Sequence, residues 1–176
     1  YGNAGAIITK NKELAEKINL LRNYGFKEKY KVEIPGFNAG LDTIQAAVLN
    51  VKLKYLDKWN NMRRKNAGKY NELLNNTNII LPEESNHSKH VYHLYVIRTK
   101  KRDKLKQHLA SKGTLTSIHY PIPTHLEKIF AYLKYRKNQY PITERLSKEV
   151  LSLPMFPGLK DEEIEYVVKN IKDGIK

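Results

Sequence analysis

Apolar residues recur along the chain with the periods of helices and strands, and the first third shows both. Residues 4–9 form a short apolar run with β-branched residues, typical of a buried strand. Asn11 is a suitable cap for the helix that follows, which we expect to end before Gly25. Residues 26–37 are polar and aromatic, with proline and glycine near their end, so we expect a loop there.

The next helical pattern is much longer than the others. Asp42 and Gln45 have the spacing of a capping box, and apolar residues then recur every three or four positions to about Leu74. An unbroken helix of this length would measure about 50 Å. A helix this long more often joins two lobes than stays within one small domain. Trp59 lies on its apolar side, where we interpret it as a packing residue.

Beyond this helix the pattern predicts a small α/β unit in which helices cover one face of a sheet. Three segments are expected to be strands: 78–81, 91–99 and 114–119. Three others are expected to be helices: about 101–112, 142–151 and 161–172. Both sides of the second strand are largely apolar, which predicts that His93 lies in the core.

Composition and charge narrow the function classes. The chain has 176 residues, a net charge of +14 and no cysteine, so disulfides and thiolate-bound zinc are excluded, and a cytoplasmic location is expected. No apolar run approaches the roughly 20 residues that span a bilayer. The basic residues are scattered over every helix rather than gathered in one stripe, which argues against a nucleic-acid binder and is compatible with a small anionic ligand. From the start, Tyr-Gly-Asn-Ala-Gly, we expect a fragment.

Candidate chemistry is concentrated in the segment Ile118–Pro123. Its two prolines restrict the backbone to an extended path, from which His119 and Tyr120 are expected to project on opposite sides. An imidazole and a phenol can donate hydrogen bonds to phosphate or sugar hydroxyls. The alternative is the packed end of a strand, and the six residues alone do not decide between the two.

Four segments match one known family in the same order. They are 1–25, 38–47, 113–126 and 144–157, with the motifs Asn-Ala-Gly-Leu-Asp, Ile-His-Tyr-Pro and Leu-Ser-Leu-Pro-Met-Phe-Pro in the last three. With these motifs the chain resembles the carboxy-terminal half of the DegT/DnrJ/StrS-type sugar-nucleotide aminotransferases. Those proteins are pyridoxal-phosphate enzymes with the aspartate-aminotransferase fold, which is fold type I.

The resemblance implies an α/β architecture and a reaction. Residues 1–40 would be a remnant of the large cofactor-binding domain, 41–75 a long connecting helix, and 76–176 the small C-terminal domain. The complete protein would move an amino group from glutamate to a keto group on a nucleotide-linked sugar, as a homodimer with shared sites. Relatives that dehydrate or deoxygenate the sugar on the same fold are the alternative, and a regulatory or nucleic-acid binder is a third class.

The resemblance also assigns residues. Asn38 corresponds to the asparagine that reaches the cofactor phosphate of the other subunit, with a turn asparagine as the structural alternative. His119 and Tyr120 correspond to residues that line the sugar-nucleotide site. Gly40 replaces the family's arginine, which removes one cation that faces the substrate. The lysine that binds the cofactor covalently would lie before Tyr1, so no catalytic residue and no metal ligand is predicted here, and His125 is interpreted as structural.

Overall fold

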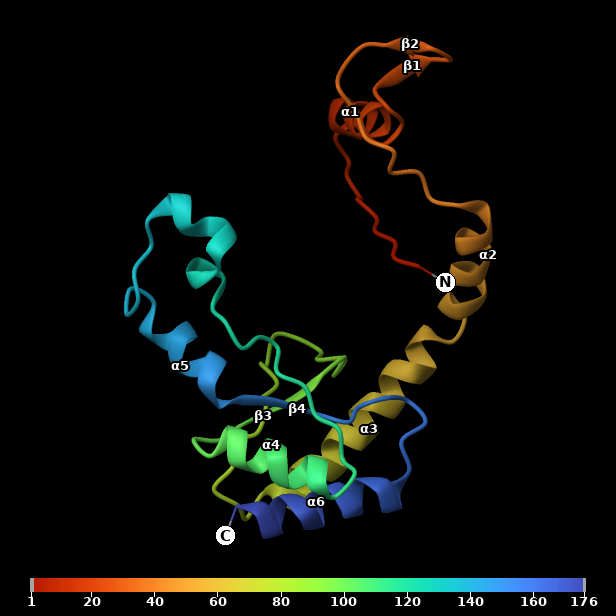
Figure 1. Ribbon diagram of the computed structural model, residues 1–176. Helices are drawn as coiled ribbons and strands as arrows, with labels where there is room; N and C mark the ends of the chain where they lie inside the picture. The colour runs from red at the N-terminus through yellow and green to blue at the C-terminus, as the bar shows by residue number, and fades with distance from the viewer. Residues whose placement is uncertain (1, 176) are drawn as a thin grey trace. The chain divides into compact units, whose positions relative to one another are not determined.

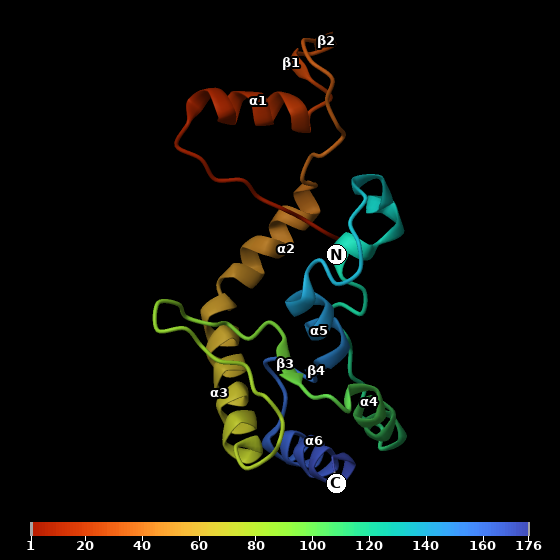
Figure 2. The same ribbon diagram turned by 90° about the vertical axis from the view of Figure 1, so that its left-hand side faces the viewer.

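A computed structural model describes residues 2–175, which form two compact units (Figures 1 and 2). The first unit ends at Leu56 and the second begins at Asp57. The described chain contains both helices and antiparallel strand pairs, so the α/β class is confirmed. The functional division at residues 40 and 75 stays a prediction.

The first unit contains two helices and a small hairpin: α1 (Lys12–Arg22), β1 (Phe26–Glu28), β2 (Lys31–Val32) and α2 (Thr43–Leu53). Both predicted ends of the first helix are confirmed. The Asn11 Oδ1 accepts a hydrogen bond from the Leu14 backbone N–H at 3.1 Å. Gly25 has a φ of +77°, and a Cβ there would lie 1.7 Å from the Ile34 carbonyl oxygen, so only glycine fits this position.

Two predictions for this unit are wrong. Residues 4–9 form no strand, and Ile8 is 97% exposed. A strand needs a neighbour to pair its backbone groups, and the described residues supply none to this segment. Residues 26–37 are not a plain loop, because they contain β1 and β2, paired antiparallel around Tyr30, whose φ is +67°.

The predicted long helix is divided into α2 and α3 (Leu56–Leu74). The break lies at Lys54 and Tyr55, where the Tyr55 N–H donates to the Lys52 carbonyl three residues back, at 3.0 Å. This tighter bond interrupts the regular four-residue ladder without any proline or glycine. The capping box at Asp42 is also absent, because the Gln45 amide donates to the Asn3 carbonyl at 2.7 Å instead.

The second unit begins with most of α3 and contains a central pair of strands. Its other elements are β3 (Tyr95–Arg98), α4 (Arg102–Ser111), the short 3-10 helices η1 (Thr124–Leu126) and η2 (Lys128–Leu133), α5 (Pro141–Glu149), β4 (Val150–Leu153) and α6 (Asp161–Gly174). β3 and β4 pair antiparallel. Single antiparallel bridges extend this pair on both sides, from Ile80 to Arg98 and from Ser117 to Ser152.

The core lies between one face of this strand pair and three helices. Tyr95 and Ile97 of β3 stand opposite Leu153 and Leu151 of β4, and all four are buried. Side chains from α3, α4 and α6 cover them, with α4 and α6 side by side (Figures 1 and 2). The buried helix residues are Ala67, Tyr70, Leu74, Leu105, Leu109, Ile164, Val167, Val168 and Ile171. Helices therefore cover one face of a sheet, as predicted.

Four predictions fail around the strands. The segments expected to be strands at 78–81 and 114–119 form only single bridges, at Ile80 and at Ser117. The helix expected to continue to residue 151 ends at Glu149, because residues 150–153 pair with β3 as β4. His93 is exposed rather than buried. The backbone is left-handed at Tyr92, with a φ of +49°, and bends at the next two residues, so the alternation of a regular strand does not reach His93.

Buried polar side chains of α3 hold the segment that follows β4. The Asn66 amide donates to the Phe156 carbonyl at 3.0 Å, and the Tyr70 hydroxyl donates to the Pro154 carbonyl at 3.1 Å. The Tyr70 ring stacks on Tyr95 with centroids 4.8 Å apart. Burial raises the pKa of both tyrosines, so their hydroxyls stay protonated and able to donate.

Leu109→Ala is expected to lower the free energy of unfolding by about 2–5 kcal/mol, because it leaves a cavity in the core. Leu109 of α4 is 0% exposed and packs within the core. The matched control is Leu115→Ala, since Leu115 is 82% exposed; its effect should be within about 0.5 kcal/mol. Denaturant titration of both variants tests this, and equal effects would contradict the assignment of the core.

Candidate functional site

His119 is held at the edge of the strand pair by a buried serine. The His119 Nδ1 lies 2.8 Å from the Ser152 Oγ, and Ser152 is 4% exposed. Ser152 also exchanges backbone hydrogen bonds with Ser117, at 2.8 and 3.2 Å. The neighbours of Ser152 on β4 face the helices, so Ser152 faces the other side. The imidazole is therefore fixed on the sheet face opposite the core.

Tyr120 lies against the His119 ring rather than on the opposite side. The two ring centroids are 5.5 Å apart with an interplanar angle of 87°, an edge-to-face contact. The expected alternation requires a regular strand, but after the bridge at Ser117 the backbone bends at His119 and forms no strand. The peptide bond between the two residues is cis.

The His119–Tyr120 pair presents polar groups that are available to a ligand. Tyr120 is 73% exposed, which does not fit a packed strand end. Neither the Tyr120 hydroxyl nor the His119 Nε2 forms a hydrogen bond with any residue from 2 to 175. Because Ser152 occupies the Nδ1, the Nε2 is the ring nitrogen left to bond a ligand. Contact with the sugar nucleotide stays a prediction.

The segment after Pro123 is fastened to α5 by His125. Its Nε2 lies 3.2 Å from the Glu144 Oε1, and both side chains are 8% exposed. The His125 ring also meets the Tyr140 ring edge-to-face at 4.8 Å. The pKa of the Glu144 carboxyl is lowered, first by the backbone N–H of Asn138 and then by His125. His125 is thus placed as the structural interpretation requires.

Asn38 lies in the first unit, in a segment that runs beside the end of α1. The Ala39 N–H donates to the Arg22 carbonyl at 3.0 Å, and the Tyr24 N–H donates to the Phe37 carbonyl at 3.0 Å, so both neighbours of Asn38 are fixed. The Asn38 side chain is exposed and makes no hydrogen bond within the described part of the chain. Its amide can therefore donate to a phosphate oxygen.

The lysines lie at or near the surface of the described chain. No lysine among residues 2–175 is buried, and the partly buried Lys69 is paired with Glu165 at 2.7 Å and with Asp161 at 3.4 Å. Over the same residues no group of histidine, aspartate or glutamate side chains could hold a metal ion. None of the described helices is long and apolar enough to span a bilayer.

Sequence reasoning missed Ser152 and Glu144. Ser152 belongs to a strand that the pattern did not predict, and nothing local links it to His119, which lies 33 residues earlier. Glu144 is the acidic residue in the first turn of α5, a common position for a carboxylate. That position indicates a favourable helix end but does not identify His125 as a partner.

A family model described as the DegT/DnrJ/EryC1/StrS aminotransferase family matches residues 1–172. The chain belongs to this family. Among curated relatives, a protein of Geobacillus stearothermophilus named "Pleiotropic regulatory protein" is 45% identical over 98% of this chain and 47% of its own length. An Aneurinibacillus thermoaerophilus protein named dTDP-3-amino-3,6-dideoxy-alpha-D-galactopyranose transaminase is 44% identical, over 95% and 46%.

The solved structures agree with this assignment. S. venezuelae DesV in complex with a ketimine intermediate matches with a TM-score of 0.90 and 38% identity, over 94% of this chain and 45% of that one. The predicted fold, part of an aspartate-aminotransferase-type enzyme, is therefore confirmed. The chain spans about half the length of the relatives it matches.

Glu144→Gln is expected to reduce the loss of stability in acid. The folded pKa of Glu144 lies below its unfolded value, so its carboxylate stabilises the fold above the unfolded pKa. This contribution is lost as the pH falls through the folded pKa. Below about pH 4.3, the ordinary pKa of glutamate, the melting temperature of the wild type should therefore fall more steeply than that of the variant. Melting curves between pH 7 and the acid limit of folding test this.

The matched control is Glu72→Gln, which neutralises an exposed carboxylate of α3. Its melting temperature should follow the wild-type pH profile. If Glu144→Gln follows that profile too, Glu144 is not the carboxylate that fastens the segment after Pro123 to α5.

Proposed function

We propose that the complete protein is a pyridoxal-phosphate-dependent aminotransferase. It moves an amino group from glutamate to the keto group of a nucleotide-linked sugar. The observation that carries this proposal is the His119–Tyr120 pair, fixed by Ser152 and open to a ligand, in a chain of this aminotransferase family. The transaminase relative named for a 3-amino sugar supports amination at C3, which the form of the Ile-His-Tyr-Pro-Ile-Pro segment also favours.

The described residues fit one part of a cofactor site. Asn38 presents an uncommitted amide from a fixed backbone, as a donor to a cofactor phosphate requires. When bound, pyridoxal phosphate supplies the electron sink that makes the amino-transfer chemistry possible. A related solved protein, NtdA from Bacillus subtilis, is described with the cofactor in its PMP form.

In this proposal, the residues of this chain bind the cofactor phosphate and orient the sugar nucleotide. The Asn38 amide donates to a phosphate oxygen of the cofactor held by a second copy of the protein, which makes the active enzyme a homodimer with shared sites. The His119 Nε2 and the Tyr120 hydroxyl bond the sugar nucleotide, and Ser152 keeps the imidazole from rotating. Contacts fixed in this way orient the keto group of the sugar for the reaction, with little further loss of conformational freedom.

The function is tested on the complete protein with pyridoxal phosphate, glutamate and a panel of thymidine- and uridine-linked keto sugars. An amino-sugar nucleotide and 2-oxoglutarate are the expected products, while this chain alone should not exceed the rate of free cofactor. Dehydrated or deoxygenated sugar without amino product would support the alternative chemistry on the same fold. No conversion, combined with salt-dependent binding to any duplex, would instead indicate a regulatory protein.

His119→Gln and Tyr120→Phe in the complete enzyme are expected to impair only the use of the sugar. Loss of one hydrogen bond should lower kcat/KM for the sugar nucleotide roughly 2- to 12-fold if the bond is neutral, and roughly 12- to 150-fold if it involves a charged phosphate. The glutamate half of the reaction should be nearly unchanged, because these side chains do not contact the amino donor. Stopped-flow traces of each half separate the two effects.

A packing role would produce a different pattern. Both halves of the reaction would then slow together, and the melting temperature would fall in the same variants. Ser152→Ala offers a further comparison, since it leaves both ligand-binding groups in place and removes only the bond that fixes His119. It should weaken use of the sugar less than His119→Gln does.

A further inference from the structure

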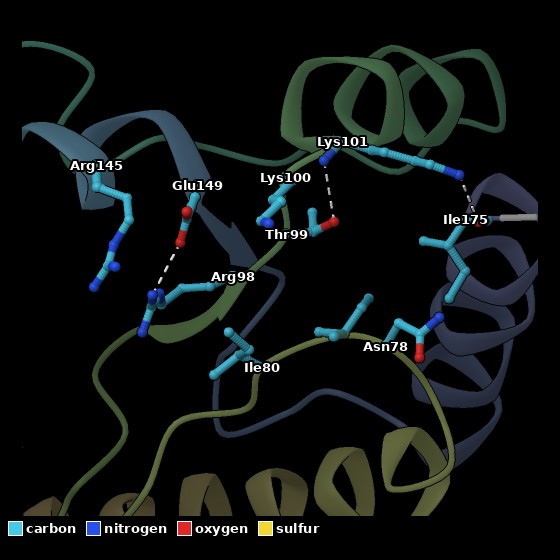
Figure 3. A pocket seen from close by; sticks show the side chains of 10 residues that line it. Asn78, Ile80, Arg98, Thr99, Lys100, Lys101, Arg145, Glu149 and Ile175 are labelled. Carbon is cyan, nitrogen blue, oxygen red and sulfur yellow. Dashed lines mark hydrogen bonds and ion pairs between the residues drawn. The ribbon is translucent and has the colours of Figure 1, made fainter.

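A cavity of about 510 Å3 opens beside the end of β3 in the second unit (Figure 3). Its lining comes from the segment before β3, the last residue of β3 and the residues just after it, α5, and the residue after α6. Four cations face it against one carboxylate, that of Glu149: they are Arg98, Lys100, Lys101 and Arg145. The lining therefore carries a clear excess of positive charge.

The wall of the cavity is fixed by hydrogen bonds. The Arg98 backbone exchanges two bonds with Ile80, at 2.9 and 3.0 Å, and the Thr99 N–H donates to the Glu149 carbonyl at 3.0 Å. The Arg98 guanidinium donates to the Glu149 carboxylate at 2.9 Å. Arg98 is thus held in one orientation, and Glu149 is already neutralised by it.

Two cations remain uncommitted at this wall. Lys100 and Arg145 are exposed and make no hydrogen bond or ion pair within residues 2–175. In the view of Figure 3 they lie on either side of the Arg98–Glu149 pair. Lys101, in contrast, donates to the Ile175 carbonyl at 3.2 Å. Unpaired cations that line a concave surface attract anions and bind phosphate oxygens by charge-assisted hydrogen bonds.

The positive excess is not a simple consequence of the charge of the whole chain. A cavity of about 610 Å3 in the first unit is lined by Arg22 and Lys27, but also by Glu16 and Glu33. There Lys27 is paired with Glu33 at 2.8 Å. Beside the cavity at β3, a second hollow of about 340 Å3 shares Lys100, Arg145 and Glu149, and adds Lys148 and Glu144. The two hollows together are lined by five cations and two carboxylates. Positive charge therefore accumulates in this region in particular.

The same cavity has an apolar part, formed by Ile79, Ile80 and Ile175. Ile80 is 51% exposed, so it can cover the flat face of a ligand. We propose that this cavity binds a nucleoside phosphate, with the phosphates on Lys100 and Arg145 and the ring system against the isoleucines. This site is additional to the function proposed above.

Calorimetric titration of the complete protein, loaded with pyridoxal phosphate, with adenosine diphosphate tests the site. Lys100→Gln and Arg145→Gln should each weaken binding roughly 10-fold or more, because each removes a charged hydrogen bond to phosphate. Both residues are exposed, so the fold should be retained. Lys169→Gln makes the same change of charge at an exposed position of α6 and should leave the affinity within about 2-fold.

Three results would overturn the proposal. One is no binding by the wild type up to millimolar adenosine diphosphate, and another is equal affinity for all the lysine and arginine variants. The third is a loss of binding in His119→Gln but not in Lys100→Gln or Arg145→Gln, which would place the nucleotide at the His119–Tyr120 pair. Pyrophosphate should bind more weakly than adenosine diphosphate, and equal affinity would reject a ligand with a ring.

Discussion

The structure of the second unit depends on the pairing of one four-residue strand, β4. It pairs with β3 along one edge and with Ser117 along the other, and it buries Leu151 and Leu153 among the helices. The buried Arg102 guanidinium donates to the Val150 carbonyl at its start and to the Ser147 carbonyl in α5. The α3 residues Asn66 and Tyr70 donate to carbonyls beyond its end. A strand so short has few ladder bonds of its own, so these side-chain bonds determine where it begins and ends.

The position of the His119 side chain depends on that strand. Alternation along β4 places two leucines in the core and Ser152 on the opposite face, where its hydroxyl meets the His119 ring. A slip of one residue would exchange these faces, so that Ser152 would point toward the helices and the leucines would point away from them. The hydrophobic core therefore fixes the register, and the register fixes the imidazole. The segment after Pro123 is held differently, by the buried pair of His125 and Glu144 rather than by strand pairing.

Features encoded within a few residues could be predicted from the sequence. Asn11 caps α1, and Gly25 ends that stretch with a positive φ. Features that depend on a distant partner could not. The run at residues 150–153 continues a helical pattern and becomes a strand only because β3 lies beside it. The family resemblance directed attention to His119 and Tyr120, but neither pattern nor resemblance indicated Ser152, because hydrogen bonds between distant residues leave no local periodicity.

The sequence also does not show which basic residues are free to bind a ligand. Arg102 is 8% exposed and bonds backbone carbonyls, Arg98 is neutralised by Glu149, and Lys100 and Arg145 make no bond to the described chain. All four appear in the sequence as scattered positive charge, and their spacing does not distinguish them. Once bonded to carbonyls or a carboxylate, a cation has little capacity left for an external anion. Ligand-binding capacity therefore belongs to the cations that the fold leaves unpaired, and only the positions of the surrounding acceptors identify them.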